Sequence, residues 1–196
     1  PFSFQLNVPQ LISGASGAIG VLKIVVKNAT DIKKGDSFVN QSFNPYVKFE
    51  LAGTTIARTN ACKDTLDPVW NETKYVLLSS FSEPLAITAM NEREKLKDKA
   101  VGRAEYNLSS LQHQNHQGSL SCNFLRNFKP AGSFNFDMTF FPVVSPKKMP
   151  DGTVEEPPEY NTGVAKITIE EIQGLGEGGE TVSYTHLRAH ETCADL

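Results

Sequence analysis

Hydrophobic and polar residues alternate in short stretches between residues 21 and 144. Alternation places every second side chain on one face of a β-strand, so residues 21–27 direct Leu22, Ile24 and Val26 to the same side. Turn residues separate these stretches about every 8–12 residues and no long helical period occurs, which is typical of an antiparallel sandwich. Strands are predicted over residues 21–27, 45–51, 54–61, 70–78, 84–91, 101–107, 119–125 and 132–141. The predicted fold is an all-β, antiparallel eight-stranded sandwich with short flanking segments, with a β-barrel as the alternative.

The same alternation predicts which side chains form the core. The inward-facing positions of the second and last strands are Val47, Phe49, Leu51, Phe134, Phe136, Met138 and Phe140. Tyr46, Lys48 and Glu50 are predicted to point outward. A short helical turn is expected over residues 109–114.

The flanking segments differ in composition from the β-rich region. Residues 145–162 are rich in proline and acidic residues, which predicts an extended linker. Residues 163–170 (GVAKITIE) resemble residues 20–27 (GVLKIVVK), so residues 163–181 are predicted to begin a second, truncated copy of the same module. Residues 182–196 resemble one reading frame of a sequencing-library adapter, so His186 and His190 are not interpreted as metal ligands. Residues 1–17 begin without methionine and are expected to be the end of a preceding domain.

The net charge of −3 hides an uneven distribution. Residues 21–144 carry 15 Lys and Arg against 12 Asp and Glu, whereas residues 145–196 carry 4 against 10. A mildly basic body suits an anionic surface, and a nucleic-acid partner is not expected. The three cysteines do not suggest a disulfide framework. No grouping of nucleophile, base and oxyanion donors occurs, and the glycine-rich residues 174–179 lack a following helix, so neither an enzyme nor a cofactor is predicted.

Three motifs carry a resemblance to a known family. They are residues 44–48 (NPYVK), residues 65–72 (TLDPVWNE) and residues 100–102 (AVG), in this order. Together they resemble the motifs of a C2 domain, and the resemblance covers residues 18–144. It implies a C2-type β-sandwich.

Two further segments narrow the resemblance. Residues 79–85 (SSFSEPL) and 136–143 (FDMTFFPV), followed by the acidic linker, look like a tricalbin, a relative of the extended synaptotagmins. In that family a lipid-transfer tube precedes a row of C2 domains. The resemblance therefore implies the first C2 domain after the tube, on the cytosolic face of membranes. It also implies a protein of the endoplasmic reticulum that bridges to the plasma membrane.

The resemblance also indicates where calcium ligands would lie. Calcium-binding C2 domains gather about five aspartates from two loops, because Ca²⁺ takes 6–8 oxygen ligands. The matching positions here are Asp36, Asn44, Asn91, Arg93 and Lys99. Arginine and lysine cannot donate an electron pair and they repel a cation. Glu92 and Asp98 are adjacent, but on an extended segment they are expected to point away. The sequence therefore predicts a degenerate calcium cup without a metal.

The replacements favour an anionic phospholipid membrane as the partner. In the two loops the candidate lipid-binding residues are Lys33, Lys34, Phe38, Arg93, Lys95 and Lys97, and on the sheet they are Tyr46, Lys48 and Arg58, with Lys63 as a further cation. Cations and aromatic rings both favour the headgroup region of an anionic leaflet. The sheet residues match half of a phosphoinositide site implied by the family. The alternative interpretation is a solvated charged loop and an exposed lysine on a sheet face.

Two functions remain open from the sequence. The first is calcium-independent docking onto an anionic leaflet, which salt should weaken. The second is a protein-interaction C2 domain that packs against a neighbouring C2 or lipid-transfer domain, which should present an exposed hydrophobic patch.

Overall fold

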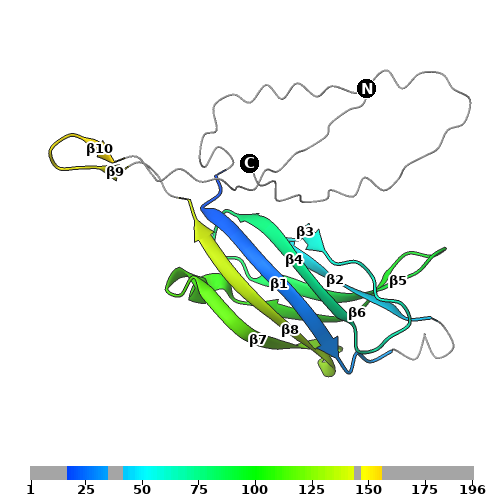
Figure 1. The fold of residues 1–196 in the computed structure, drawn as a ribbon. Helices are drawn as coiled ribbons and strands as arrows, with labels where there is room; N and C mark the ends of the chain where they lie inside the picture. Colours follow the sequence, from blue (N-terminus) through cyan, green and yellow to red (C-terminus); the bar gives the residue numbers. More distant parts are fainter. Residues whose placement is uncertain (1–16, 35–41, 144–146, 156–196) are drawn as a thin grey trace, which may run out of the picture. The chain divides into compact units, whose positions relative to one another are not determined.

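Eight antiparallel strands make up most of the structure, a computed structural model that describes residues 17–34, 42–143 and 147–155 (Figure 1). The strands are β1 (Gly20–Thr30), β2 (Asn44–Leu51), β3 (Thr54–Arg58), β4 (Val69–Leu78), β5 (Leu85–Glu92), β6 (Lys99–Tyr106), β7 (His116–Arg126) and β8 (Lys129–Pro142). Each of the eight predicted strands is present.

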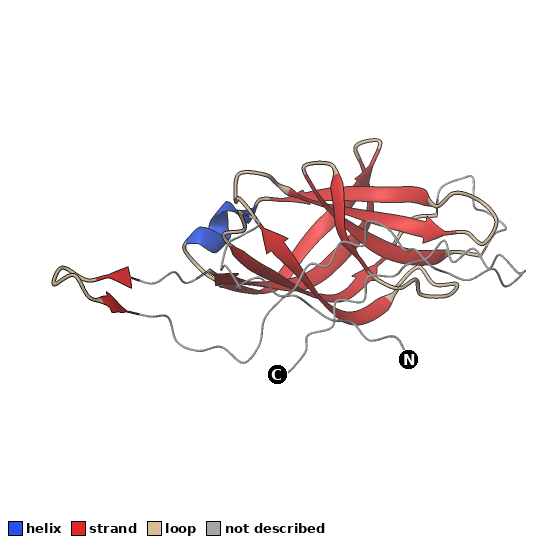
Figure 2. Cartoon of the chain, turned by 90° about the horizontal axis from the view of Figure 1, so that it is seen from above, coloured by secondary structure: helices blue, strands red, loops and turns tan. Residues whose placement is uncertain are grey.

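The strands hydrogen-bond in the order β3-β2-β5-β6-β7-β8-β1-β4. β6 and β7 share a single residue pair, Arg103 with Leu125, so the ladder nearly breaks there and the strands divide into two four-stranded layers (Figures 1 and 2). The two outermost strands of the order, β3 and β4, are fully described and do not pair with each other. The fold is therefore an open sandwich and not a closed barrel, and the predicted fold class is confirmed.

Aromatic side chains from both layers fill the space between them. The ring of Phe134 on β8 stacks on Phe136, with 5.0 Å between the ring centroids. It also approaches Phe124 of β7 at 5.7 Å and Phe49 of β2 and Trp70 of β4 at 6.2 Å each. Most of the predicted inward positions are buried in this core, namely Leu22, Ile24, Val26, Val47, Phe49, Phe134, Phe136, Met138 and Phe140, and Leu51 is half-buried against it.

Two smaller elements lie outside the sandwich strands. The expected helical turn is a 3₁₀ helix, η2 (Leu108–Gln112), which begins where the Asn107 side chain accepts a hydrogen bond from the Ser109 N–H. Within the predicted extended linker, β9 (Lys147–Lys148) and β10 (Val154–Glu155) pair as a short hairpin. Its Asp151-Gly152 turn, with Gly152 at φ +87°, is a hairpin signal that the sequence interpretation missed.

Several predicted segments lie outside the described residues. These are residues 1–16, the later part of the linker, the second module at 163–181 and the tail at 182–196. Among the residues that are described, no helix is long and apolar enough to cross a membrane.

Candidate functional site

The connections that follow β1, β3, β5 and β7 meet at one end of the sandwich. We use the name loop end for the described parts of these connections, residues 31–34, 42–43, 59–68, 93–98 and 127–128, together with the adjoining strand residues Arg126 and Lys129. Three backbone hydrogen bonds of 3.1 Å brace it, donated by Ile32 to Leu66, by Thr65 to Phe43 and by Lys33 to Ala131. The Asp67 carboxylate adds a fourth bond, at 2.7 Å from the N–H of Asp31, whose backbone is left-handed at φ +55°. The loops are therefore held in place by the protein's own hydrogen bonds.

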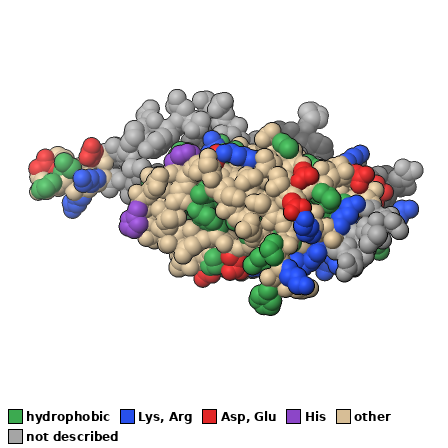
Figure 3. Space-filling view, turned by 90° about the horizontal axis from the view of Figure 1, so that it is seen from below, with side chains coloured by type: hydrophobic (Ala, Val, Ile, Leu, Met, Phe, Trp, Pro, Cys, Tyr) green, Lys and Arg blue, Asp and Glu red, His purple; other side chains and the backbone are tan. Residues whose placement is uncertain are grey.

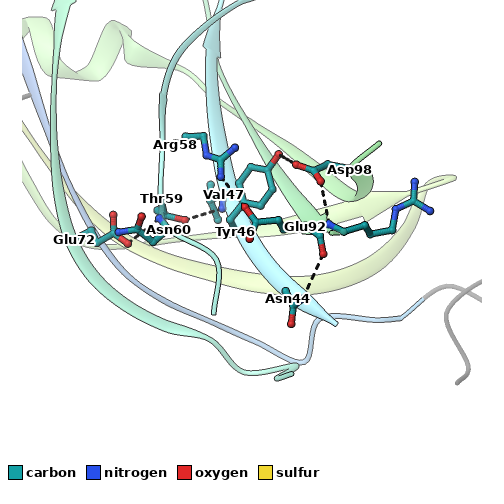
Figure 4. A network of polar contacts seen from close by, with 10 residues as sticks. Asn44, Tyr46, Val47, Arg58, Thr59, Asn60, Glu72, Glu92 and Asp98 are labelled. Carbon is teal, nitrogen blue, oxygen red and sulfur yellow. Dashed lines mark hydrogen bonds and ion pairs between the residues drawn. The ribbon is translucent and has the colours of Figure 1, made fainter. Parts of the chain in front are cut away.

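Two of the positions that match calcium ligands are hydrogen-bonded into this brace. The N–H of Asn44 donates to the side-chain oxygen of Asn91 at 2.8 Å, and Asn91 is fully buried. The side-chain oxygen of Asn44 accepts from the N–H of Asp64 at 3.1 Å, and its amide nitrogen points to the Glu92 carbonyl at 3.5 Å (Figure 4). Both amide oxygens thus already accept a hydrogen bond from a backbone N–H.

The loop after β5 is closed by internal bonds. The Asp98 carboxylate accepts from the N–H of Arg93 at 3.0 Å and from the hydroxyl of Tyr46 at 2.9 Å (Figure 4). The Arg93 guanidinium donates to the carbonyl of Lys97. Asp98 therefore faces β2, and its acidic neighbour Glu92 pairs with Arg58 at 2.9 Å. Within the described ranges, no three His, Cys, Asp or Glu side chains are grouped to hold a metal ion. Asp36 lies outside those ranges.

Tyr46 lies beneath a cation on the outer face of the β3-β2-β5-β6 layer. It points away from the core as predicted, yet it is only 4% exposed, because Arg58 sits over its ring at 4.3 Å. Burial, and then the hydrogen bond to Asp98, raise the pKa of Tyr46 to about 12. The hydroxyl is therefore a donor throughout the physiological range.

Three cations of this sheet face, Lys48, Arg58 and Arg103, each have a carboxylate partner. Lys48 lies opposite both Arg58 and Thr88, and Thr88 lies opposite Arg103, so the four residues form one row across the layer. Lys48 pairs with Glu50 at 2.9 Å and Arg103 with Glu105 at 3.2 Å, in addition to the Arg58–Glu92 pair. Tyr46, Lys48 and Arg58 lie on neighbouring strands, and neighbouring carboxylates offset the positive charge of Lys48 and Arg58. Because Lys48 and Glu50 share one strand face, their pairing could have been predicted.

The predicted cations of the loop end differ in their surroundings. Lys33 pairs with Asp31, and Lys34 lies 5.9 Å from the ring centroid of Phe43. Lys63, Lys95 and Lys97 are exposed and form no ion pair in the described part of the chain. Phe38 lies outside the described residues. Figure 3 shows Lys and Arg side chains gathered at one end of the described domain, with hydrophobic side chains among them.

The sequence interpretation missed the exposed hydrophobic residues at this end. Leu66 is 38% exposed, Leu96 63% and Phe128 99%. Leu96 lies between Lys95 and Lys97 and Phe128 precedes Lys129, whereas Leu66 lies between Thr65 and Asp67. Leu96 could have been predicted to be exposed, because it is the single apolar residue of a charged loop. No sequence prediction covered the connection that contains Phe128.

The fold and these loop motifs define the class of the protein. The family model for the C2 domain matches residues 20–122, so the chain belongs to the C2 domain family. The fold agrees with solved structures, among them a single C2 domain of plant extended synaptotagmin 1, with a TM-score of 0.55 at 17% identity over 65% of this chain and 98% of that one. A structure of two C2 domains of extended synaptotagmin 2 gives a TM-score of 0.54 at 19% identity, over 72% of this chain and 48% of that one.

Among curated proteins the chain is similar to tricalbins. It is 50% identical to Tricalbin-1 of Saccharomyces cerevisiae over 93% of its own length, and 45% identical to Tricalbin-2 of the same yeast over 90%. In both cases the chain spans 15% of the relative. The predicted resemblance to a tricalbin C2 domain is confirmed.

Proposed function

We propose that this chain is a calcium-independent, membrane-docking C2 module of a tether between the endoplasmic reticulum and the plasma membrane that takes part in lipid transport. Its role is binding and not catalysis. The observation that carries the proposal is the loop end. Asn44 and Asn91 are hydrogen-bonded where calcium ligands would stand, while Lys63, Lys95 and Lys97 are exposed without a carboxylate partner in the described residues. Because internal hydrogen bonds already hold the loops and the lysines already supply positive charge, this surface can bind an anionic leaflet without a metal ion.

The strength of this docking follows from the number of unpaired cations. Each Lys or Arg near a phosphatidylserine surface contributes about 1 kcal/mol. Lys63, Lys95 and Lys97 together would contribute about 3 kcal/mol, which is a weak affinity for one module acting alone. The proposed context therefore includes neighbouring C2 domains and a lipid-transfer domain, whose linkage supplies the effective concentration. The module boundaries at residues 17, 144, 162 and 181 are part of this proposal.

The test is co-sedimentation of the 196-residue chain with phosphatidylserine vesicles and with neutral phosphatidylcholine vesicles. Calcium or a chelator is added to each, across a salt series. We expect binding to the anionic vesicles that is equal with calcium and chelator and that falls as salt rises. Binding that requires calcium would show that the loop ligands are misassigned here. Absence of binding under every condition would contradict docking.

A packing role is the second candidate, and a different surface supports it. Ile19, Phe141 and Val143 are 36%, 50% and 36% exposed, and the N–H of Val143 donates to the Ile19 carbonyl at 2.9 Å. This apolar group lies at the opposite end of β1 and β8 from the loop end. A neighbouring domain could cover it. If vesicles fail to bind, this surface becomes the leading candidate, and Phe141→Asp should then weaken association with the flanking domain.

A further inference from the structure

The turn between β7 and β8 carries a phenylalanine that contributes nothing to the fold. Arg126 pairs with Lys129, so Asn127 and Phe128 form a two-residue hairpin turn. The side chain of Phe128 is 99% exposed. A phenylalanine in this position leaves its whole apolar surface in water, which folding alone does not favour.

The backbone of the turn also disfavours this residue. Asn127 and Phe128 have φ values of +50° and +62°, which is the left-handed region. Two-residue turns of this kind favour Asn followed by Gly, because a bulky side chain at positive φ is strained. Asn127 fits the preference and Phe128 does not. The exposure of Phe128 and its backbone conformation are independent observations. Both indicate that the ring contacts a partner outside the domain.

The surroundings of the ring indicate the chemistry of that partner. Arg126 and Lys129 flank the turn, and the Arg126 guanidinium donates to the carbonyl of Lys33 at 3.2 Å, which places the turn beside the connection after β1. No Asp or Glu occurs in the sequence between Glu105 and Asp137. An exposed aromatic ring flanked by two cations, with no acidic residue on the turn or on the strand ends beside it, complements an anionic headgroup layer above an apolar interior.

We infer that Phe128 is an apolar anchor that enters the bilayer when the loop end docks onto an anionic membrane. The inference rests on the proposed docking function and adds a contact outside the positions that match calcium ligands. Arg126 and Lys129 would lie at the headgroup level on either side of the ring. Insertion of the ring depends on apolar area and not on charge, so its contribution should persist at salt concentrations that screen the lysines.

The decisive variant is Phe128→Gly, because glycine is favoured in the left-handed region. We expect it to raise the thermal stability of the chain and yet to weaken binding to phosphatidylserine vesicles about tenfold. A merely structural role predicts that stability and binding change in the same direction. The control is Val154→Ala, which shortens an exposed apolar side chain on β10, outside the loop end and the packing surface, and should leave vesicle binding unchanged.

A direct readout comes from Phe128→Trp in the 196-residue chain. The natural Trp70 is 8% exposed and gives a constant background. We expect the new tryptophan to shift its emission to the blue on addition of phosphatidylserine vesicles, and brominated lipids to quench it. Vesicle binding without a shift, or Phe128→Gly binding as tightly as the wild type, would overturn the insertion and assign the ring to a protein partner, while docking by lysines would stand. Failure of the wild type to bind would overturn both.

Discussion

The outer faces of the two layers and the loop end both carry lysine and arginine, but the two regions differ in how these cations are paired. On the sheet faces, Lys27, Lys48, Lys74 and Arg103 lie within 3.2 Å of a carboxylate on the same or a neighbouring strand. At the loop end, Lys63, Lys95 and Lys97 form no such pair among the described residues. Surface ion pairs add little stability, yet each one offsets a charge that an anionic partner would otherwise meet.

This difference shows why the number of cations does not locate an anion-binding surface. The row of Lys48, Arg58 and Arg103 contains three cations, as many as the group of Lys63, Lys95 and Lys97, and it includes two of the sheet residues predicted from the family resemblance. Its carboxylate partners, Glu50, Glu92 and Glu105, make the row nearly neutral. The loop end keeps a net positive charge because its described residues include eight Lys and Arg against five Asp and Glu.

The largest expected effect comes from removing charge at each region in turn. Lys95→Ala with Lys97→Ala should weaken binding to phosphatidylserine vesicles about 30-fold, from about 1 kcal/mol for each lysine. The matched double variant Lys48→Ala with Arg103→Ala removes the same charge from the sheet face and should weaken binding by less than about threefold, because those cations are already paired. Co-sedimentation at low salt measures both. Equal losses in the two variants would contradict the distinction between the regions.

A second variant tests whether the loop end depends on its internal brace. Asn91→Ala removes the acceptor of the Asn44 N–H at a fully buried position, and should lower the free energy of unfolding by about 1–2 kcal/mol. The control Asn123→Ala lies on the exposed face of β7 and should change it by less than about 0.5 kcal/mol. Urea denaturation measures both. Calcium should stabilise neither protein, and a calcium-dependent increase in the wild type would show that Asn91 belongs to a working metal site.

These two regions also show how much of the fold and of the candidate site could be predicted from the sequence. The alternation of Phe134, Phe136 and Met138 is a local property of one strand, so the core face of β8 could be predicted without knowing its neighbours. The Asn44–Asn91 bond joins residues 47 positions apart, and the Arg58–Glu92 pair joins residues 34 apart. Such contacts depend on how β2, β3 and β5 are aligned, which no local pattern contains. The motifs therefore predicted the positions of the candidate site but not the partners that determine its charge.

Tyr46 lies on the sheet face and donates a hydrogen bond to Asp98 of the loop end, so it connects the two regions. Its substitution should have a smaller effect on the free energy of unfolding. Tyr46→Phe removes the hydrogen bond to Asp98 and should lower the free energy of unfolding by about 1 kcal/mol at pH 8. Because the pKa of Tyr46 is raised to about 12 from about 10 in the unfolded chain, the folded state holds this proton more tightly. Wild-type stability should therefore fall as pH rises from about 10 to about 12, and the difference from Tyr46→Phe should shrink over that window.

Urea denaturation at several pH values between 8 and 12 follows this difference. The other tyrosines titrate in both proteins and cancel in the comparison. A difference that stays constant up to pH 12 would show that the Tyr46 proton is not held by the folded structure.

The smallest expected change in stability comes from breaking an ion pair on the β7-β8-β1-β4 layer. Asp137 on β8 accepts from Lys27 on β1 at 2.7 Å, and this hydrogen bond lowers the pKa of the Asp137 carboxyl. A lowered pKa in the folded state adds stability that is present above the unfolded value of about 3.9 and is lost as pH falls through the folded value. Asp137→Asn should therefore lower the free energy of unfolding by less than about 1 kcal/mol at pH 7, and the difference from the wild type should shrink as pH falls through the folded pKa of Asp137.

The same variant bears on the comparison between the regions, because it leaves Lys27 without its carboxylate. If pairing is what keeps the sheet faces from attracting an anionic leaflet, Asp137→Asn should bind phosphatidylserine vesicles slightly more tightly than the wild type, by no more than about fivefold for one released cation. Adding Lys27→Ala to Asp137→Asn should return binding to the wild-type level. An Asp137→Asn protein that binds no more tightly would show that the position of a lysine at the loop end, and not its lack of a partner, determines whether it meets the membrane.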